Sequence, residues 1–303
     1  SDVYKRQLYK VFYYVASTLS FSEAASQLFI SQSAVSQSIK TLEKKLNQTL
    51  FIRSTKKVQL TPEGEILLRH IEPAVHLIGR GEAQLMDTSA GGGQLRIGAS
   101  DTICRYFLVP YLEKFHKAFP GAHIKVTNAT SIKCVELLES GQVDLIVVNC
   151  PNAYLGSLFS VNTIRSFHDV FIANQSFREL KGKKLSYRQL LEYPILMLDK
   201  KSTTSEFLHS LFQQHQLDLV PEIELSSNDL LIDLARIGLG LAFIPDYCID
   251  HENEDLFIID LKEKLPAREL ALAYNKHLPV SGALQEFLSS VSYTHLRAHE
   301  TKA

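Results

Sequence analysis

Apolar residues recur at helical spacing in two segments near the start of the chain, and only a short turn separates them. The first segment follows Ser20, and Glu23 stands three residues later, which is the pattern of a capping box. The second follows Ser31 and carries an apolar stripe made of Val35, Ile39, Leu42 and Leu46. Two capped helices this close together predict a helix-turn-helix.

The opposite face of the second helix carries short polar side chains, at Ser33, Ser36, Gln37 and Lys40. Such hydroxyls and amides can hydrogen-bond base edges if the helix lies in a major groove. An ordinary helix pair with a solvated face uses the same residue types. The pattern alone therefore leaves both interpretations open.

A short hairpin is predicted directly after these helices. Residues 50–61 alternate apolar and polar on either side of a Ser-Thr-Lys-Lys turn, which indicates a wing with a basic tip. Residues 8–62 contain seven Lys or Arg against two Glu, a net charge of plus five, whereas the whole chain has minus one. A basic module on an otherwise acidic chain favours contact with phosphates. We therefore expect DNA contacts from Ser31, Gln32, Ser33, Ser36, Gln37, Lys40, Arg53, Lys56 and Lys57.

At these residues the sequence resembles the amino-terminal domain of LysR-type transcriptional regulators. The resemblance runs over about sixty residues without a gap and includes Phe21-Ser22-Glu23-Ala24-Ala25, Ser31-Gln32-Ser33-Ala34-Val35-Ser36, Leu42-Glu43, Leu50-Phe51-x-Arg53 and Leu60-Thr61-Pro62-Glu63-Gly64. Family members often have Pro in place of Ser33 and Arg in place of Gln37. Glutamine suits adenine, so we expect a half-site rich in A·T pairs. Asn47, where the family usually has Gly, is expected to take a left-handed helix cap.

A linker helix is predicted after Pro62, with a seam of Leu67, Ile71, Ala74, Ile78 and Leu85 at alternating helical spacings. Such a seam favours pairing with a second copy, which would require a pseudo-palindromic operator. The alternative is that the helix packs on its own domain, and Pro73 predicts a kink in either case. The resemblance favours a homodimer, with homotetramers formed from two dimers. Residues 90–93, Ala-Gly-Gly-Gly, are interpreted as a hinge.

Beyond residue 93 the pattern changes to alternating strands and helices, and the same order occurs twice. The first series is expected at 94–100, 103–119, 123–128, 132–140 and 143–149, and the second at 195–198, 205–215, 222–225, 228–237 and 239–244. Matching points such as Thr130 and Ser227 lie 97 residues apart. Two similar α/β lobes in tandem imply a cleft at their strand ends.

The resemblance implies an α+β multidomain protein, with a winged helix-turn-helix at 1–62 and a linker helix at 63–89. A two-lobed α/β effector domain similar to type 2 periplasmic binding proteins would follow. Its lobe I would comprise 94–162 and 269–291, and its lobe II 163–268. Residues 292–303 resemble translated sequencing-adapter read-through, so we expect a non-native tail there.

Hydroxyl side chains precede the helices at the predicted strand ends. Helix amino termini offer free amides to an anion, although ordinary capping needs the same residue types. Lys200 and Lys201 add positive charge while Asp101 opposes it, so we expect a small carboxylate or similar anion. By resemblance, the effector contacts would be Ser100, Thr102, Thr130, Ser131, Asn149, Ser202, Thr203 and Ile244.

Catalytic motifs are not found in the sequence: it has no nucleophile elbow, zinc-protease pair or phosphate loop. Its four cysteines lack metal-ligand spacing, so we expect reduced thiols, with a redox role for Cys104 as the less favoured alternative. We therefore expect no catalytic residues, metal or cofactor. The longest apolar run, 145–148, is too short to span a membrane, which favours a cytoplasmic protein.

The patterns and the resemblance together imply a dimeric or tetrameric regulator that binds double-stranded DNA and acts indirectly on RNA polymerase. A small effector between the lobes would modulate promoter binding. The alternative is the same DNA-binding module joined to an oligomerisation domain that needs no effector.

Overall fold

A computed structural model describes residues 2–53, 57–86, 93–249 and 255–300. The chain divides into two units, the first formed by residues 1–87 with 139–142 and the second by the rest. Lys56 and residues 90–92 of the predicted hinge lie outside the described residues.

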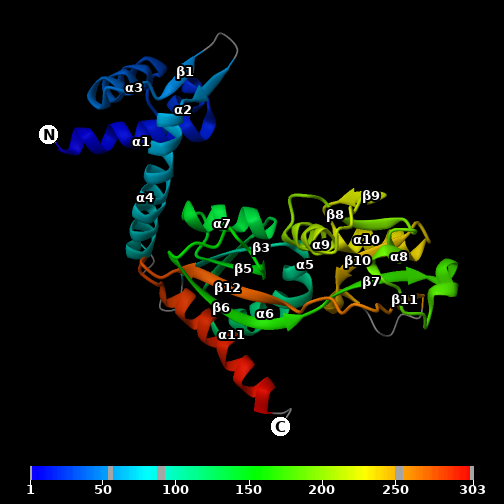
Figure 1. Ribbon diagram of the computed structural model, residues 1–303. Coiled ribbons are helices and arrows are strands. Elements are labelled where there is room, and N and C mark those ends of the chain that lie inside the picture. The colour runs from blue at the N-terminus through cyan, green and yellow to red at the C-terminus, as the bar shows by residue number, and fades with distance from the viewer. Residues whose placement is uncertain (1, 54–56, 87–92, 250–254, 301–303) are drawn as a thin grey trace. The chain divides into compact units, whose positions relative to one another are not determined.

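The first unit contains a helix-turn-helix followed by a hairpin (Figure 1). Its elements are α1 (Asp2–Thr18), α2 (Phe21–Leu28), α3 (Gln32–Leu46), β1 (Phe51–Arg53), β2 (Val58–Leu60) and α4 (Pro62–Met86). Both predicted caps are confirmed, since Ser20 Oγ accepts from the Glu23 amide and Ser31 Oγ from the Ala34 amide, each at 3.2 Å. Asn47 is left-handed, with φ 51°, as predicted.

Helix α4 packs its first turns onto this unit. Leu67 and Ile71 of the predicted seam are partly buried against the core formed by α1 to α3. The start of α4 lies so close to the segment around Leu50 that only glycine fits at position 64. A Cβ on Gly64 would lie 2.3 Å from the Leu50 carbonyl oxygen. The seam residues that stay exposed are Ala74, Ile78 and Leu85.

Lobe I of the second unit is a sheet in the order β4-β3-β5-β12-β6, covered on both faces (Figure 1). Its strands are β3 (Gln94–Ala99), β4 (His123–Asn128), β5 (Leu145–Cys150), β6 (Phe159–Phe167) and β12 (Arg268–Asn275). Helices α6 (Val109–Ala118) and α11 (Gly282–Glu300) cover one face, where Phe115 meets Phe287. Helix α7 (Ser131–Glu139) covers the other. The helix predicted at 103–119 is instead three pieces: α5 (Asp101–Ile103), the π-helix η1 (Cys104–Leu108) and α6.

Lobe II repeats this plan with the order β11-β7-β10-β8-β9. Its strands are β7 (Asp169–Asn174), β8 (Ile195–Leu198), β9 (Ile223–Leu225), β10 (Leu241–Pro245) and β11 (Leu256–Ile258). Helix α10 (Asn228–Arg236) covers one face, whereas α8 (Tyr187–Leu190) and α9 (Thr203–Gln214) cover the other. Two 3₁₀ helices, η2 (Gln175–Leu180) and η3 (Asp246–Cys248), connect strands.

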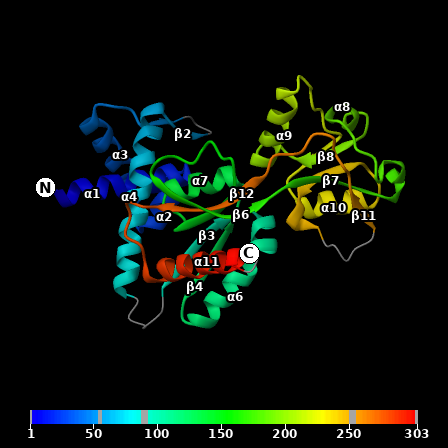
Figure 2. The same cartoon turned by 60° about the horizontal axis from the view of Figure 1, so that its bottom comes forward.

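The lobes are joined by two chain crossings, visible in Figure 2 where β6 leads to β7 and the chain returns into β12. The predicted boundary at residue 162 is wrong, because β6 stays paired with β12 as far as Phe167. The first crossing therefore falls at His168, between β6 and β7. The expected return near Glu269 agrees with β12, which begins at Arg268.

Candidate functional site

Helix α3 packs one face into the core of the first unit and leaves the opposite face exposed to solvent. Val35, Ile39 and Leu42 have no exposed surface. The residues predicted to read DNA lie on the other side: Ser31, Gln32, Ser33, Gln37 and Lys40 are exposed, and Ser36 is half-buried. Short polar side chains on a firmly packed helix are the arrangement that direct base readout requires.

The wing is fixed to α3 through Glu43, a residue that the sequence interpretation did not single out. Its Oε1 accepts from the amides of Leu50 at 2.8 Å and Phe51 at 3.3 Å. Its other oxygen lies 3.9 Å from an Arg53 nitrogen, and the Arg53 guanidinium stands 4.3 Å from the centre of the Phe21 ring. Arg53 is thus oriented by its own domain, while Lys57 is exposed.

In lobe I, the predicted effector residues gather where parallel strands end. Strand β3 pairs with β4 and β5, so Ser100, Thr130 and Asn149 fall at neighbouring carboxyl ends. Ser131 Oγ accepts from the Asn149 amide at 3.0 Å. The Oδ1 atom of Asn149 is buried without a hydrogen-bond partner, although a buried acceptor normally has one.

In lobe II, Ser202 and Thr203 begin α9 and are buried. Ser202 Oγ caps the Ser205 amide at 3.1 Å, as Ser100 caps Ile103 and Thr130 caps Lys133, each at 3.3 Å. Capping, the alternative that the sequence left open, is therefore a real role of these hydroxyls. A capping hydroxyl accepts through its oxygen, and its proton can still be donated. The Ser202 hydroxyl donates to the Asp199 carbonyl at 3.0 Å, so Ser100 and Thr130 are the caps of this set that can donate to a ligand.

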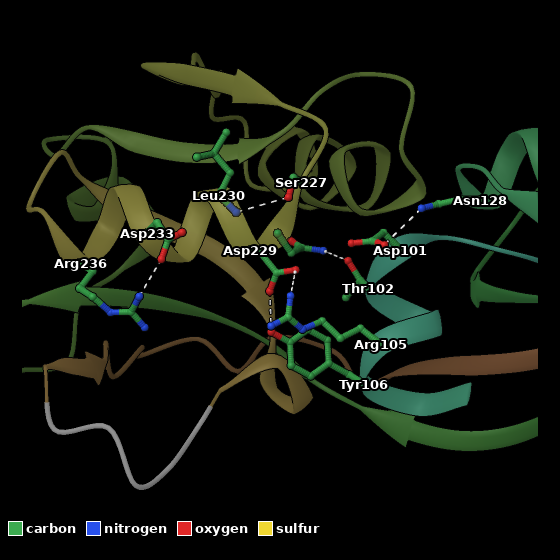
Figure 3. A network of polar contacts seen from close by, with 11 residues as sticks. Asp101, Thr102, Arg105, Tyr106, Asn128, Ser227, Asp229, Leu230, Asp233 and Arg236 are labelled. Carbon is green, nitrogen blue, oxygen red and sulfur yellow. Dashed lines mark hydrogen bonds and ion pairs between the residues drawn. The ribbon is translucent and has the colours of Figure 1, made fainter. Parts of the chain in front are cut away.

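Side chains of the two lobes also form hydrogen bonds with each other, and one of them involves the predicted effector residue Thr102. Asn228, the first residue of α10, donates from Nδ2 to Thr102 Oγ1 at 2.9 Å. Tyr106 of η1 donates to Asp229 Oδ1 at 2.6 Å, and Arg105 donates to Oδ2 of the same carboxylate at 3.2 Å (Figure 3). Desolvation and the Asp229 carboxylate raise the pKa of Tyr106 above its usual value, so the phenol remains a donor at neutral pH.

A buried arginine links the lobes and was not anticipated. Arg268 opens β12 in lobe I and donates to Asp169 Oδ2 of β7 at 2.8 Å. It also reaches Thr204 Oγ1 at 3.0 Å and Thr203 Oγ1 at 3.4 Å. In contrast, Lys200 and Lys201, whose charges were considered in the sequence, are exposed. The ordered positive charge next to Thr203 therefore comes from Arg268.

Ile244 does not lie with the other predicted effector residues. It is fully buried within β10 and faces α10, among Ile172, Leu198 and Ile232. The prediction assigned it by its place near the end of a strand, and its side chain lies on the α10 face of the sheet, where it also lines a pocket.

The cysteines lack the properties of reactive thiols. All four are free, and burial followed by the charge of Asp101 raises the pKa of Cys104 to about 11. Burial likewise raises the pKa of Cys134 to about 12. A redox role needs an accessible thiolate, so Cys104 is poorly suited to one. Over the described residues, no group of three or more His, Cys, Asp or Glu side chains is placed to hold a metal ion. The helices in that part of the chain also include none long and apolar enough to cross a membrane.

These features define a class of protein, one with a winged DNA-reading unit and a two-lobed α/β unit. Comparisons with known proteins agree. Residues 7–65 match the family model described as "Bacterial regulatory helix-turn-helix protein, lysR family", and residues 89–293 match the model described as "LysR substrate binding domain". The chain therefore belongs to the LysR family of transcriptional regulators, and it is a regulator rather than an enzyme.

Individual proteins resemble the chain over two thirds or more of its length. The transcriptional activator CmpR of Synechocystis is 28% identical over 286 residues, which is 92% of each chain. The solved structure of CbnR with its target DNA has a TM-score of 0.64 at 18% identity, covering 95% of this chain and 99% of that one. The CcmR regulatory domain of Synechocystis in complex with 2-PG has a TM-score of 0.61 at 22% identity, covering 67% of this chain and 97% of that domain. These structural likenesses describe the fold.

Proposed function

We propose that the protein regulates transcription by placing α3 in the major groove of a pseudo-palindromic site. The single observation that carries this proposal is the two-sided character of α3, with Val35, Ile39 and Leu42 buried and Ser33, Gln37 and Lys40 exposed. Gln37 would contact adenine through its amide, and Lys40, Lys56 and Lys57 would contact phosphates. CbnR, whose fold is similar, was solved on its target DNA.

The second part of the proposal concerns the effector. A small anion would accept hydrogen bonds from Ser100, Thr130 and Ser131, with Thr102 and Thr203 adding hydroxyls from both lobes. Ser202 would line the site while its own proton stays on the Asp199 carbonyl. The partnerless Asn149 Oδ1 is an acceptor, so the ligand would also carry a donor such as a hydroxyl. A hydroxylated carboxylate or phosphate has this chemistry. The CcmR regulatory domain, whose fold is similar, was solved with 2-PG.

Pairing of two copies would place two α3 helices on two half-sites. The exposed apolar residues of α4 support this, since Ile78 is 62% and Leu85 84% exposed. We therefore propose a homodimer through the later turns of α4, and a homotetramer as the pair of dimers. Such a protein acts where the chromosome lies, in the cytoplasm, and it would influence RNA polymerase through its position on the promoter.

A thermal-shift titration of the full chain with 2-PG, glycolate and inorganic phosphate tests the effector proposal. A ligand that binds only the folded state raises the midpoint as its concentration rises. Ser131→Ala should abolish that rise, whereas Ser289→Ala on the exposed side of α11 should preserve it. If none of the three raises the midpoint while DNA binding is intact, the effector-independent oligomerisation domain becomes the better interpretation.

A further inference from the structure

A pocket of about 610 Å³ lies on the α10 face of lobe II. Six aliphatic side chains line it, together with polar ones, and they come from β7, α10, β10, β11 and the residue after η3: Ile172, Ile232, Ile244, Ile249, Leu256 and Ile258. Arg105 and Tyr106, which belong to η1 of lobe I, also line it. A pocket of this size and lining can enclose a small organic molecule.

The charged part of the pocket lining consists of two acid–arginine pairs spread along α10. Asp229 accepts from both Tyr106 and Arg105 (Figure 3). Arg236 donates from Nη1 to Asp233 Oδ1 at 2.6 Å. Since each carboxylate already faces a donor, the lining offers no free anion to attract a cationic ligand.

The Nε–H group of Arg236 lacks an acceptor. Its nitrogen is buried and makes no hydrogen bond to the described residues. A buried donor left without an acceptor is costly, and a hydrogen bond from guanidinium to carboxylate is among the stronger ones. The ligand that fits the pocket therefore combines an apolar body with an acceptor head group.

We propose that this pocket is a second ligand site and that it takes a small amphipathic carboxylate. It is separate from the proposed effector site at the strand ends, which includes Ser100, Thr130 and Ser131. The aliphatic wall receives the body of the ligand, and Arg236 binds the head group. Because Arg105 and Tyr106 come from the other lobe, the pocket is complete only while η1 contacts α10. The segment that supplies them is a π-helix, a form common at functional sites. Ligand binding is thereby coupled to the arrangement of the lobes.

Isothermal titration calorimetry on the full-length protein tests the site, with octanoate as the probe and octylamine as the oppositely charged control. Ile258, 42% exposed at the wall, allows a filling substitution with little risk to the core, and Ile237, 69% exposed and outside the lining, is its matched control. Ile258→Trp should weaken octanoate binding at least about tenfold, and Ile237→Trp should leave it unchanged. Arg236→Met should also weaken octanoate by about tenfold, because the head group loses its donor.

Thr130→Val, a change in the proposed effector site at the strand ends, shows which of the two sites binds octanoate. Octanoate binding that survives Thr130→Val but not Ile258→Trp places the ligand in the pocket. Octanoate that fails to bind the wild type, binds Ile258→Trp and Arg236→Met normally, or is lost in Thr130→Val would overturn the proposal. Equal affinity for octylamine would overturn the role of Arg236. None of these outcomes affects the thermal-shift result for the strand-end site.

Discussion

Arg268 and Asp169 form an ion pair of 2.8 Å in which neither side chain is exposed to solvent. The two residues lie 99 positions apart, on strands of different lobes, where the chain crosses between the sheets. Phe167 and Phe207 flank the guanidinium, with ring centres 5.4 and 4.9 Å from Cζ. Full burial raises the pKa of Asp169, and the charge of Arg268 opposes that rise.

Breaking this pair should be strongly destabilising. Asp169→Asn leaves the arginine charge buried without compensation, which costs about 3 to 5 kcal/mol in comparable cases. The exposed Lys133–Glu136 pair on α7 provides the control, since Glu136→Gln should cost less than about 1 kcal/mol. Urea unfolding of the full chain measures both. A loss below about 1 kcal/mol for Asp169→Asn would show that the lobe junction does not depend on the pair.

Alkylation of Cys104 should depend steeply on pH. Its pKa of about 11 means that the reactive thiolate is scarce at pH 7.5 and increases about tenfold per pH unit up to that value. Asp101→Asn removes a charge that raises this pKa, so the thiol should react faster at pH 8 than in the wild type. Iodoacetamide labelling followed by peptide mass spectrometry measures the rate, with Glu113→Gln as the control. A Cys104 that reacts as fast as a free thiol at pH 7.5 would contradict the buried environment.

Glu43 should matter for the position of the wing. Glu43→Ala removes the acceptor of two backbone amides, so we expect a loss of about 1.5 to 3 kcal/mol in the stability of the first unit. Glu23→Ala is the control, because that exposed carboxylate accepts only from the Gln27 side chain among the described contacts. Hydrogen exchange of the 50–60 segment measures the effect. Unchanged protection there would rule out Glu43 as the anchor.

Lys40 should contribute affinity without specificity. A phosphate contact releases a counterion, so Lys40→Ala should reduce the slope of log affinity against log salt by about one on every duplex. Lys117→Ala, on α6 in the other unit, should change nothing. Fluorescence anisotropy across a salt series gives the slopes, and a loss confined to one sequence would instead make Lys40 a base reader.

Local patterns predicted most helices and the parallel strands of the second unit, because caps and apolar spacing act over a few residues. The 97-residue repeat is reflected in two glycines that follow α7 and α10, Gly141 and Gly238, with φ of 71° and 83°. At Gly238 a Cβ would also lie 2.9 Å from Ser176 Oγ, so this turn requires glycine.

The features that the sequence did not reveal depend on contacts between residues that are far apart in the chain. Nothing near Arg268 indicates its partner Asp169, and the extent of β6 is set by β12 more than 100 residues later. The sequence likewise did not reveal that Leu67 and Ile71 of the α4 seam are partly buried against the core of their own unit. An apolar stripe shows that a face is covered, but not whether its own domain or a second copy covers it.

The most direct test of the account is selection of binding sites from a random duplex library by the full-length protein and by Gln37→Ala. We predict that the wild type selects two inverted half-sites, and that Gln37→Ala loses preference at one base position in each, a cost of about 1 to 3 kcal/mol there. Selection of no duplex by the wild type, or of the same sequence with the same strength by both proteins, would contradict the assignment of α3 as the reader.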